Sequence, residues 1–123
     1  MKFLSPRVHG TIDYLFVALF LLAPTIFGFS GLPATLATGI AVVHLALTMC
    51  TAFPLGVLKF IPFPAHGWFE LIAGSTAVLS PWIFSFRECE AAKNFFLISG
   101  VGMLAVWLLS DYSASRASVG QDD

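Results

Sequence analysis

The stretch His9-Gly10-Thr11-Ile12-Asp13 returns 57 positions later as His66-Gly67-Trp68-Phe69-Glu70. At the same spacing, Pro24-Thr25-Ile26-Phe27-Gly28-Phe29 returns as Pro81-Trp82-Ile83-Phe84-Ser85-Phe86. Chance alone gives about two or three identities in an alignment of this length and composition, so we interpret the match as a duplicated unit. Without gaps, residues 2–29 and 59–86 share nine identical pairs among 28: Lys2/Lys59, Phe3/Phe60, His9/His66, Gly10/Gly67, Leu22/Leu79, Pro24/Pro81, Ile26/Ile83, Phe27/Phe84 and Phe29/Phe86.

The composition is that of a membrane protein. The chain is 58% hydrophobic and 11% charged, whereas a soluble domain has about 45–50% apolar and about 25% charged residues. Its four apolar stretches, about 6–29, 33–53, 65–86 and 91–110, each have the roughly 20 residues that a helix needs to cross a bilayer. The sequence therefore predicts an all-α membrane protein with four transmembrane helices.

The repeat organises these helices into two hairpins. We expect a first two-helix unit over 1–57, a second over 58–112, and a disordered polar tail over 113–123. Because each unit crosses the membrane twice, both units enter it from the same side, as parallel repeats. The segment rich in proline and glycine around Pro54 and Gly56 marks the break between the units.

The distribution of basic residues predicts how the chain is oriented in the membrane and which partners it binds. Four basic residues fall on the side that holds both termini and two on the other, which favours cytoplasmic termini in a bacterial inner membrane. These residues are Lys2, Arg7, Lys59 and Arg116 on one side, and Arg87 and Lys93 on the other. The net charge is −1 and no basic cluster exists, so we expect no nucleic-acid partner. The expected partners are the lipid bilayer and either further copies of the chain or a larger membrane complex.

The helix ends carry recognisable signals. Ser5 followed by Pro6 is typical of an N-cap with proline in the first turn, and Pro33 opens the second helix in a similar way. Pro24 and Pro81 lie in the last two turns of their spans. We interpret the aromatic residues that follow them, Trp82 among them, as an interfacial belt.

The repeated His-Gly-x-x-acid segments hold the candidate metal ligands His9, Asp13, His66 and Glu70. Each histidine and its acid are four residues apart, on one face of a helix. If the two pairs face each other, two imidazoles and two carboxylates can bind a divalent metal or relay a proton. In the alternative, each acid holds its own histidine or caps a helix end. We favour this structural role, because groups in the first two turns reach headgroups and water.

His44 is the deepest ionisable residue, about midway along the second predicted helix. A haem or quinone site is one interpretation, but bis-histidine ligation needs a second deep histidine. We expect His44 to hydrogen-bond a carbonyl or a threonine of a neighbouring helix, and we expect no bound cofactor. The sequence contains no Walker motif, no HExxH and no GxSxG elbow, so we do not expect an enzyme.

The segment Leu79-Ser80-Pro81-Trp82-Ile83-Phe84 resembles the signature of the SPW-repeat membrane protein family, carried by Ser80, Pro81 and Trp82. In the first unit, Ala23-Pro24-Thr25, the proline Pro24 alone matches. The resemblance implies a duplicated two-helix membrane unit, with no established activity, cofactor or catalytic residue.

Three hypotheses about function follow. The first is a structural or interaction component of the membrane. The second is a small dimeric transporter or channel that uses Asp13 and Glu70. The third is a redox subunit that binds a metal, haem or quinone through His9, His66 or His44.

Overall fold

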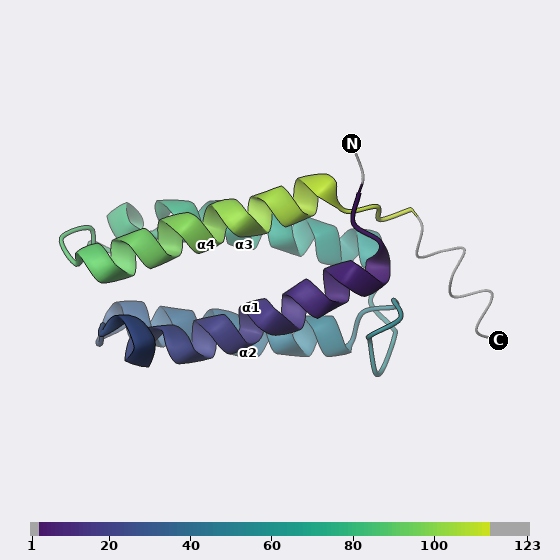
Figure 1. Cartoon of the computed structure of the whole chain (residues 1–123), viewed down its shortest axis with the longest axis horizontal. Helices are drawn as coiled ribbons and strands as arrows, with labels where there is room; N and C mark the ends of the chain where they lie inside the picture. Colours follow the sequence, from purple (N-terminus) through teal and green to yellow (C-terminus); the bar gives the residue numbers. More distant parts are fainter. Residues whose placement is uncertain (1–2, 114–123) are drawn as a thin grey trace.

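The computed structural model describes residues 3–113, which form four helices. These are α1 (Pro6–Phe27), α2 (Leu32–Met49), α3 (Phe63–Ile83) and α4 (Glu90–Leu109). Figure 1 shows two antiparallel hairpins, α1 with α2 and α3 with α4, lying alongside each other. Helices α1 and α3 begin at the same end of the molecule, where α2 and α4 finish. This end holds the site described below and is called the site end.

Three of these helices, α1, α2 and α4, are long and apolar enough to cross a membrane. Helix α3 has 21 residues but is not among these three, and its ionisable residues are His66 and Glu70. Both of these side chains are buried inside the protein. Large apolar side chains such as Leu15, Ile72 and Ile98 face outward instead. The prediction of an all-α membrane protein is confirmed.

The predicted helix starts are present. The Ser5 side chain accepts a hydrogen bond from the Val8 N–H at 3.3 Å, and Pro6 is the first residue of α1. Pro33 lies in the first turn of α2, and Glu90 lies in the first turn of α4. The carboxylate of Glu90 is thus placed where it favours the helix dipole.

The repeated Pro-x-Ile-Phe-x-Phe segments are helix exits. The N–H of Phe29 donates to the carbonyl of Pro24 at 3.0 Å, and the N–H of Phe86 donates to that of Pro81 at 2.9 Å. The residue before each phenylalanine, Gly28 or Ser85, has a positive φ of 71° or 59°. This is the Schellman arrangement, in which a left-handed residue ends the helix and a buried apolar residue follows.

Helix α2 is shorter than predicted. It ends at Met49 instead of continuing to Phe53. The chain then turns back, so that the N–H of Ile61 donates to the carbonyl of Cys50 at 2.8 Å and that of Ala52 donates to the carbonyl of Ile61 at 2.7 Å. Hydropathy alone did not reveal this end, because Phe53 is buried against the site instead of extending the span.

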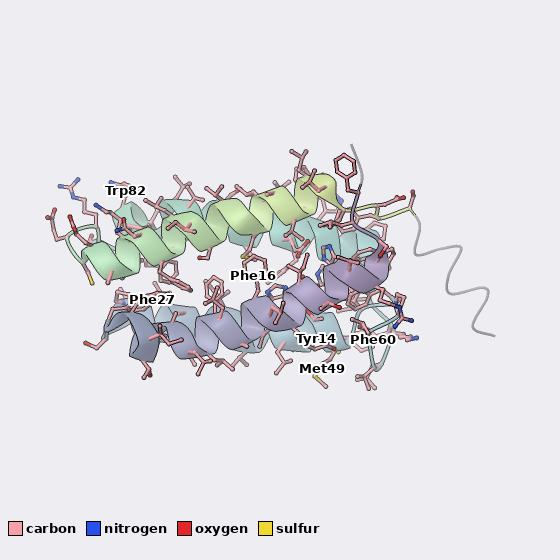
Figure 2. All side chains as sticks on the ribbon, viewed as in Figure 1. Tyr14, Phe16, Phe27, Met49, Phe60 and Trp82 are labelled. Atoms are coloured by element: carbon pink, nitrogen blue, oxygen red, sulfur yellow. The ribbon has the colours of Figure 1, made fainter. Side chains whose placement is uncertain are left out.

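Small residues of α3 and α4 bring these helices close together. A Cβ added at Gly100 would lie 2.9 Å from the carbonyl oxygen of Gly74, and one at Gly74 would lie 3.2 Å from that of Gly100. The two hairpins touch each other less closely than the helices within each hairpin. In the space between α1 and α4 lies Phe16, labelled in Figure 2. Contacts at the site end are therefore important for holding the two hairpins together.

Candidate metal centre

Five ionisable side chains meet inside the site end of the molecule. His9 and Asp13 come from α1, His44 from α2, and His66 and Glu70 from α3. All five are at most 1% exposed. They include both repeated histidine–acid pairs, which lie against each other and not on separate surfaces.

The distances between the two pairs are as short as those within them. His9 Nε2 lies 3.2 Å from Asp13 Oδ2 in its own helix and 3.2 Å from Glu70 Oε1 of the other hairpin. His66 Nε2 lies 3.6 Å from Glu70 Oε1 but 3.1 Å from Asp13 Oδ2. The two Nε2 atoms are 3.4 Å apart. One ligand atom from each of the four residues lies within 4.8 Å of every other.

Each of the two imidazoles has one hydroxyl group beside its Nδ1, and this hydroxyl fixes which ring nitrogen carries the proton. Ser110 Oγ lies 2.6 Å from His9 Nδ1 and donates to the carbonyl of Val106 at 2.6 Å. Since a hydroxyl has one proton, His9 Nδ1 must carry the hydrogen of the other contact. Thr51 holds His66 in the same way, at 2.8 Å from Nδ1, while it donates to the carbonyl of Leu47 at 2.6 Å.

In both neutral imidazoles, Nε2 is therefore the nitrogen without a proton. Its lone pair then faces the other Nε2 and two carboxylate oxygens, which are all hydrogen-bond acceptors. Acceptors packed together in a buried site repel one another unless a cation lies among them. This cluster of acceptor atoms therefore favours a positive charge at the centre of the four residues.

Each carboxylate also has an outer neighbour. The Tyr112 hydroxyl donates to Glu70 Oε2 at 2.7 Å. Burial, and then the charge of Glu70, raise the pKa of the Tyr112 hydroxyl well above its usual value, so that it stays protonated and remains a donor. On the other acid, Asp13 Oδ1 lies 3.4 Å from His44 Nε2. All four candidate ligands thus have an outer neighbour, as metal ligands in proteins usually do.

The two supporting hydroxyls reach the site in equivalent ways. Ser110 follows α4 and pairs with Leu4, ahead of α1; Thr51 follows α2 and pairs with Ile61, ahead of α3. Each pairing has two backbone hydrogen bonds of 2.7–3.1 Å. Each histidine is therefore supported by the hairpin to which it does not belong.

Aromatic rings cover the same centre. Phe53 lies over Gly10 and Tyr112 lies over Gly67, where an added Cβ would come within 2.5 Å and 2.8 Å of the respective rings. An aromatic ring from a non-helical segment thus occupies the space beside each glycine. Phe63 also packs edge-on against the ring of His9, at 4.9 Å between centroids.

Two sequence expectations about the ionisable residues are wrong. The histidine–acid pairs were expected to reach headgroups and water, but both are fully buried because the segments after α2 and α4 fold over them. His44 was expected to bond a carbonyl or threonine, but its Nε2 instead faces Asp13. It lies near the end of α2, since that helix stops at Met49.

The signature residues lie elsewhere. Pro24, Ser80, Pro81 and Trp82 lie near the ends of α1 and α3, away from the five ionisable residues. Ser80 is buried and donates to the carbonyl of Ala77, and Trp82 is half exposed. Figure 2 shows Trp82 at the end opposite the termini, where an interfacial aromatic residue belongs.

Sequence reasoning missed Thr51, Ser110 and Tyr112 altogether. None of them belongs to the repeated segments, and a hydroxyl just past a helix end is common in any chain.

Comparisons with protein-family models, curated proteins and solved structures find no match for this chain.

Proposed function

We propose that this protein is a small structural component of the membrane in which a divalent transition-metal ion joins the two hairpins. The proposed ligands are His9 Nε2, Asp13 Oδ2, His66 Nε2 and Glu70 Oε1. The observation that carries the proposal is the convergence of these four atoms, from two hairpins, on one buried point.

The spacing of the four atoms suits a tetrahedral ion. Ligand atoms at about 2.0–2.2 Å from such an ion are about 3.3–3.6 Å from one another. Five of the six ligand-to-ligand distances run from 3.1 to 3.6 Å. The sixth joins the carboxylate oxygens of Asp13 and Glu70, in a set whose members all lie within 4.8 Å of one another. Two imidazoles and two carboxylates suit Zn²⁺ first, with Fe²⁺ and Mn²⁺ as competitors.

Charge supports a metal over protons. Two carboxylates and two neutral imidazoles carry a charge of −2, which one divalent ion neutralises. Protonating both imidazoles also gives neutrality, but it points two N–H groups at each other across 3.4 Å. At that distance, like charges in a buried site repel strongly. A single ion at the centre avoids this repulsion and satisfies all four ligands.

A structural role suits the site better than catalysis. Four protein ligands complete a tetrahedral shell, whereas catalytic zinc sites keep a position open for water or substrate. The ligands are buried, and Phe53, Phe63 and Tyr112 pack around His9. The ion would hold together hairpins that otherwise touch little, so we propose that it sets their relative position.

The remaining parts of the proposal concern origin and setting. We propose that the chain arose by duplication of one hairpin, consistent with the equivalent pairings of Leu4 with Ser110 and Ile61 with Thr51. We further propose a place among SPW-repeat proteins and in a bacterial inner membrane. The orientation is proposed from the sequence count of basic residues, four on the side of both termini against two, in which Lys2 and Arg116 lie outside the described residues.

Metal analysis tests the proposal. The protein is purified in mild detergent through a tag without histidines, and its metal content is measured by mass spectrometry. We expect about one equivalent of a transition metal per chain. The double variant His9→Gln, His66→Gln should lose it, because glutamine lacks the imidazole lone pair.

The matched control is Glu88→Gln, which removes a carboxylate that is 90% exposed at the other end of the molecule. This variant should keep the metal. Folded wild-type protein that contains no metal, and takes up none from buffers with Zn²⁺, Fe²⁺ or Mn²⁺, would contradict the proposal.

A second candidate function is a proton relay. It is favoured by the buried polar atoms His44 Nδ1 and Thr48 Oγ1, which have no hydrogen-bond partner among the described residues. A relay through Asp13 predicts that Asp13→Asn abolishes proton flux in liposomes while metal-free wild-type protein supports it.

A further inference from the structure

We propose that the segment Ser110–Ser113, here called the C-terminal strap, is the gate through which the metal enters and leaves. This inference rests on the proposed metal site and adds how the site exchanges its ion. A buried tetrahedral ion cannot be released without a route along which water and a competing ligand reach it. The question is which part of the cover opens.

Two segments cover the site. One is the loop from Cys50 to Pro62, which supplies Thr51 and Phe53, and the other is the C-terminal strap, which supplies Ser110 and Tyr112. Both are equivalent in what they offer the site: a hydroxyl to an imidazole and an aromatic ring over a glycine. They differ in how firmly the chain holds them.

The loop is closed and compact. It leaves α2 and returns into α3, and its backbone bonds back to the end of α2 through Val57 and Leu58, which both donate to the carbonyl of Met49 at 2.7 and 2.9 Å. Phe53 is fully buried. A Cβ added at Gly56 would lie 1.8 Å from the carbonyl oxygen of Thr51, so the chain at Gly56 packs too tightly against Thr51 to admit a side chain.

Among the described residues, the strap is attached to a helix at one end only, since it leaves α4 and enters no further helix. Asp111 and Tyr112 are partly exposed, and Ser113 is exposed. The Asp111 N–H donates to the carbonyl of Leu4 at 3.1 Å, longer than the 2.7 Å of the equivalent bond from Ala52 to Ile61 in the loop.

Opening the strap would expose ligands from both hairpins. Tyr112 bonds the outer oxygen of Glu70 and its ring lies 5.6 Å from that of His9, between centroids. Ser110 holds the far nitrogen of His9. Moving this one segment therefore uncovers a carboxylate of α3 and an imidazole of α1 together, and water can replace the Tyr112 hydroxyl on Glu70.

The test is the rate at which Zn²⁺ passes from the loaded protein to an excess of chelator. Tyr112→Ala should release Zn²⁺ at least about tenfold faster than wild type, within the range by which outer-shell changes alter metal binding. Tyr112→Phe keeps the ring but loses the bond to Glu70, so its rate should be intermediate. Trp82→Ala, which removes a half-exposed aromatic residue at the opposite end, should release Zn²⁺ at the wild-type rate.

A second measurement needs no metal. In amide hydrogen exchange, the N–H of Asp111 should exchange faster than that of Ala52, its equivalent in the loop. Equal release rates in wild type, Tyr112→Phe and Tyr112→Ala would overturn the gate while leaving the metal site intact, and so would faster exchange at Ala52. Wild-type protein that binds no Zn²⁺ would overturn the proposed function, and the gate with it.

Discussion

The two covers of the buried centre, the 50–62 loop and the C-terminal strap, serve it in the same way with different residues. Thr51 and Ser110 hold the two imidazoles at nearly the same distance. The acids differ: Asp13 lies against a buried histidine of α2, whereas Glu70 accepts a hydrogen bond from the partly exposed Tyr112. Both halves therefore support their imidazole with a hydroxyl, but only the acid of the second half, Glu70, has a partly exposed residue as its outer neighbour.

The largest expected effect concerns the loop. Gly56→Ala would drive a methyl group into the backbone carbonyl of Thr51, which has no flexible way to yield. We expect a loss of about 3 kcal/mol in the free energy of unfolding, because the clash is with backbone. Thermal unfolding in detergent measures it.

The matched control for this change is Gly39→Ala in α2, where nothing lies within 4 Å of the added Cβ. It should leave stability unchanged or slightly raised, since alanine favours a helix. If Gly56→Ala unfolds at the same temperature as Gly39→Ala, the loop is looser than described and the contrast between the covers fails.

The next effect tests the equivalence of the hydroxyls. Thr51→Val and Ser110→Ala each leave a buried imidazole N–H without an acceptor, which costs about 1–3 kcal/mol. Each should also weaken Zn²⁺ binding by about 10–100-fold, as loss of an outer-shell partner does. Competition with a chelator of known affinity measures the second quantity.

Thr35→Val is the control for both. Its hydroxyl also donates to the carbonyl four residues earlier, that of Gly31, but it lies on the exposed surface of α2. This variant should bind Zn²⁺ as the wild type does. An unchanged affinity in Thr51→Val with a large loss in Ser110→Ala would show that the two covers do not support the histidines equally.

The smallest effect concerns the helix exits. Ser85 and Gly28 both end a helix with positive φ, a conformation that glycine adopts without strain. Ser85→Gly should therefore raise the free energy of unfolding by up to about 1 kcal/mol, and Gly28→Ala should lower it by about 1 kcal/mol. Opposite signs in thermal unfolding are the expected result; a loss of stability in both variants would contradict equivalent exits.

The fold was largely predictable from the sequence, because bilayer-length apolar stretches and local end signals such as Ser5-Pro6 act over short distances. The end of α2 was not predictable in this way. Residues 50–53 continue the apolar pattern, and the chain leaves the helix there to bury Phe53 against His9, a contact between distant segments.

The site was predictable only where local spacing along a helix determines it. The spacing of His9 with Asp13 and of His66 with Glu70 places each pair on one helix face, but it does not place the two faces together. That placement, the position of His44, and the support from Thr51, Ser110 and Tyr112 arise from tertiary packing. Hydroxyl residues after a helix carry no sign of such a role in the sequence alone.

The central claim is that one metal ion lies among His9, Asp13, His66 and Glu70, joining the two hairpins. Anomalous X-ray diffraction from crystals of the protein, recorded on both sides of the absorption edge of the bound metal, tests it most directly. We predict a single strong peak within about 2.0–2.2 Å of the two Nε2 atoms and of one oxygen from each carboxylate. Well-ordered side chains in this arrangement, with no anomalous peak between them in crystals soaked in Zn²⁺, would contradict the account.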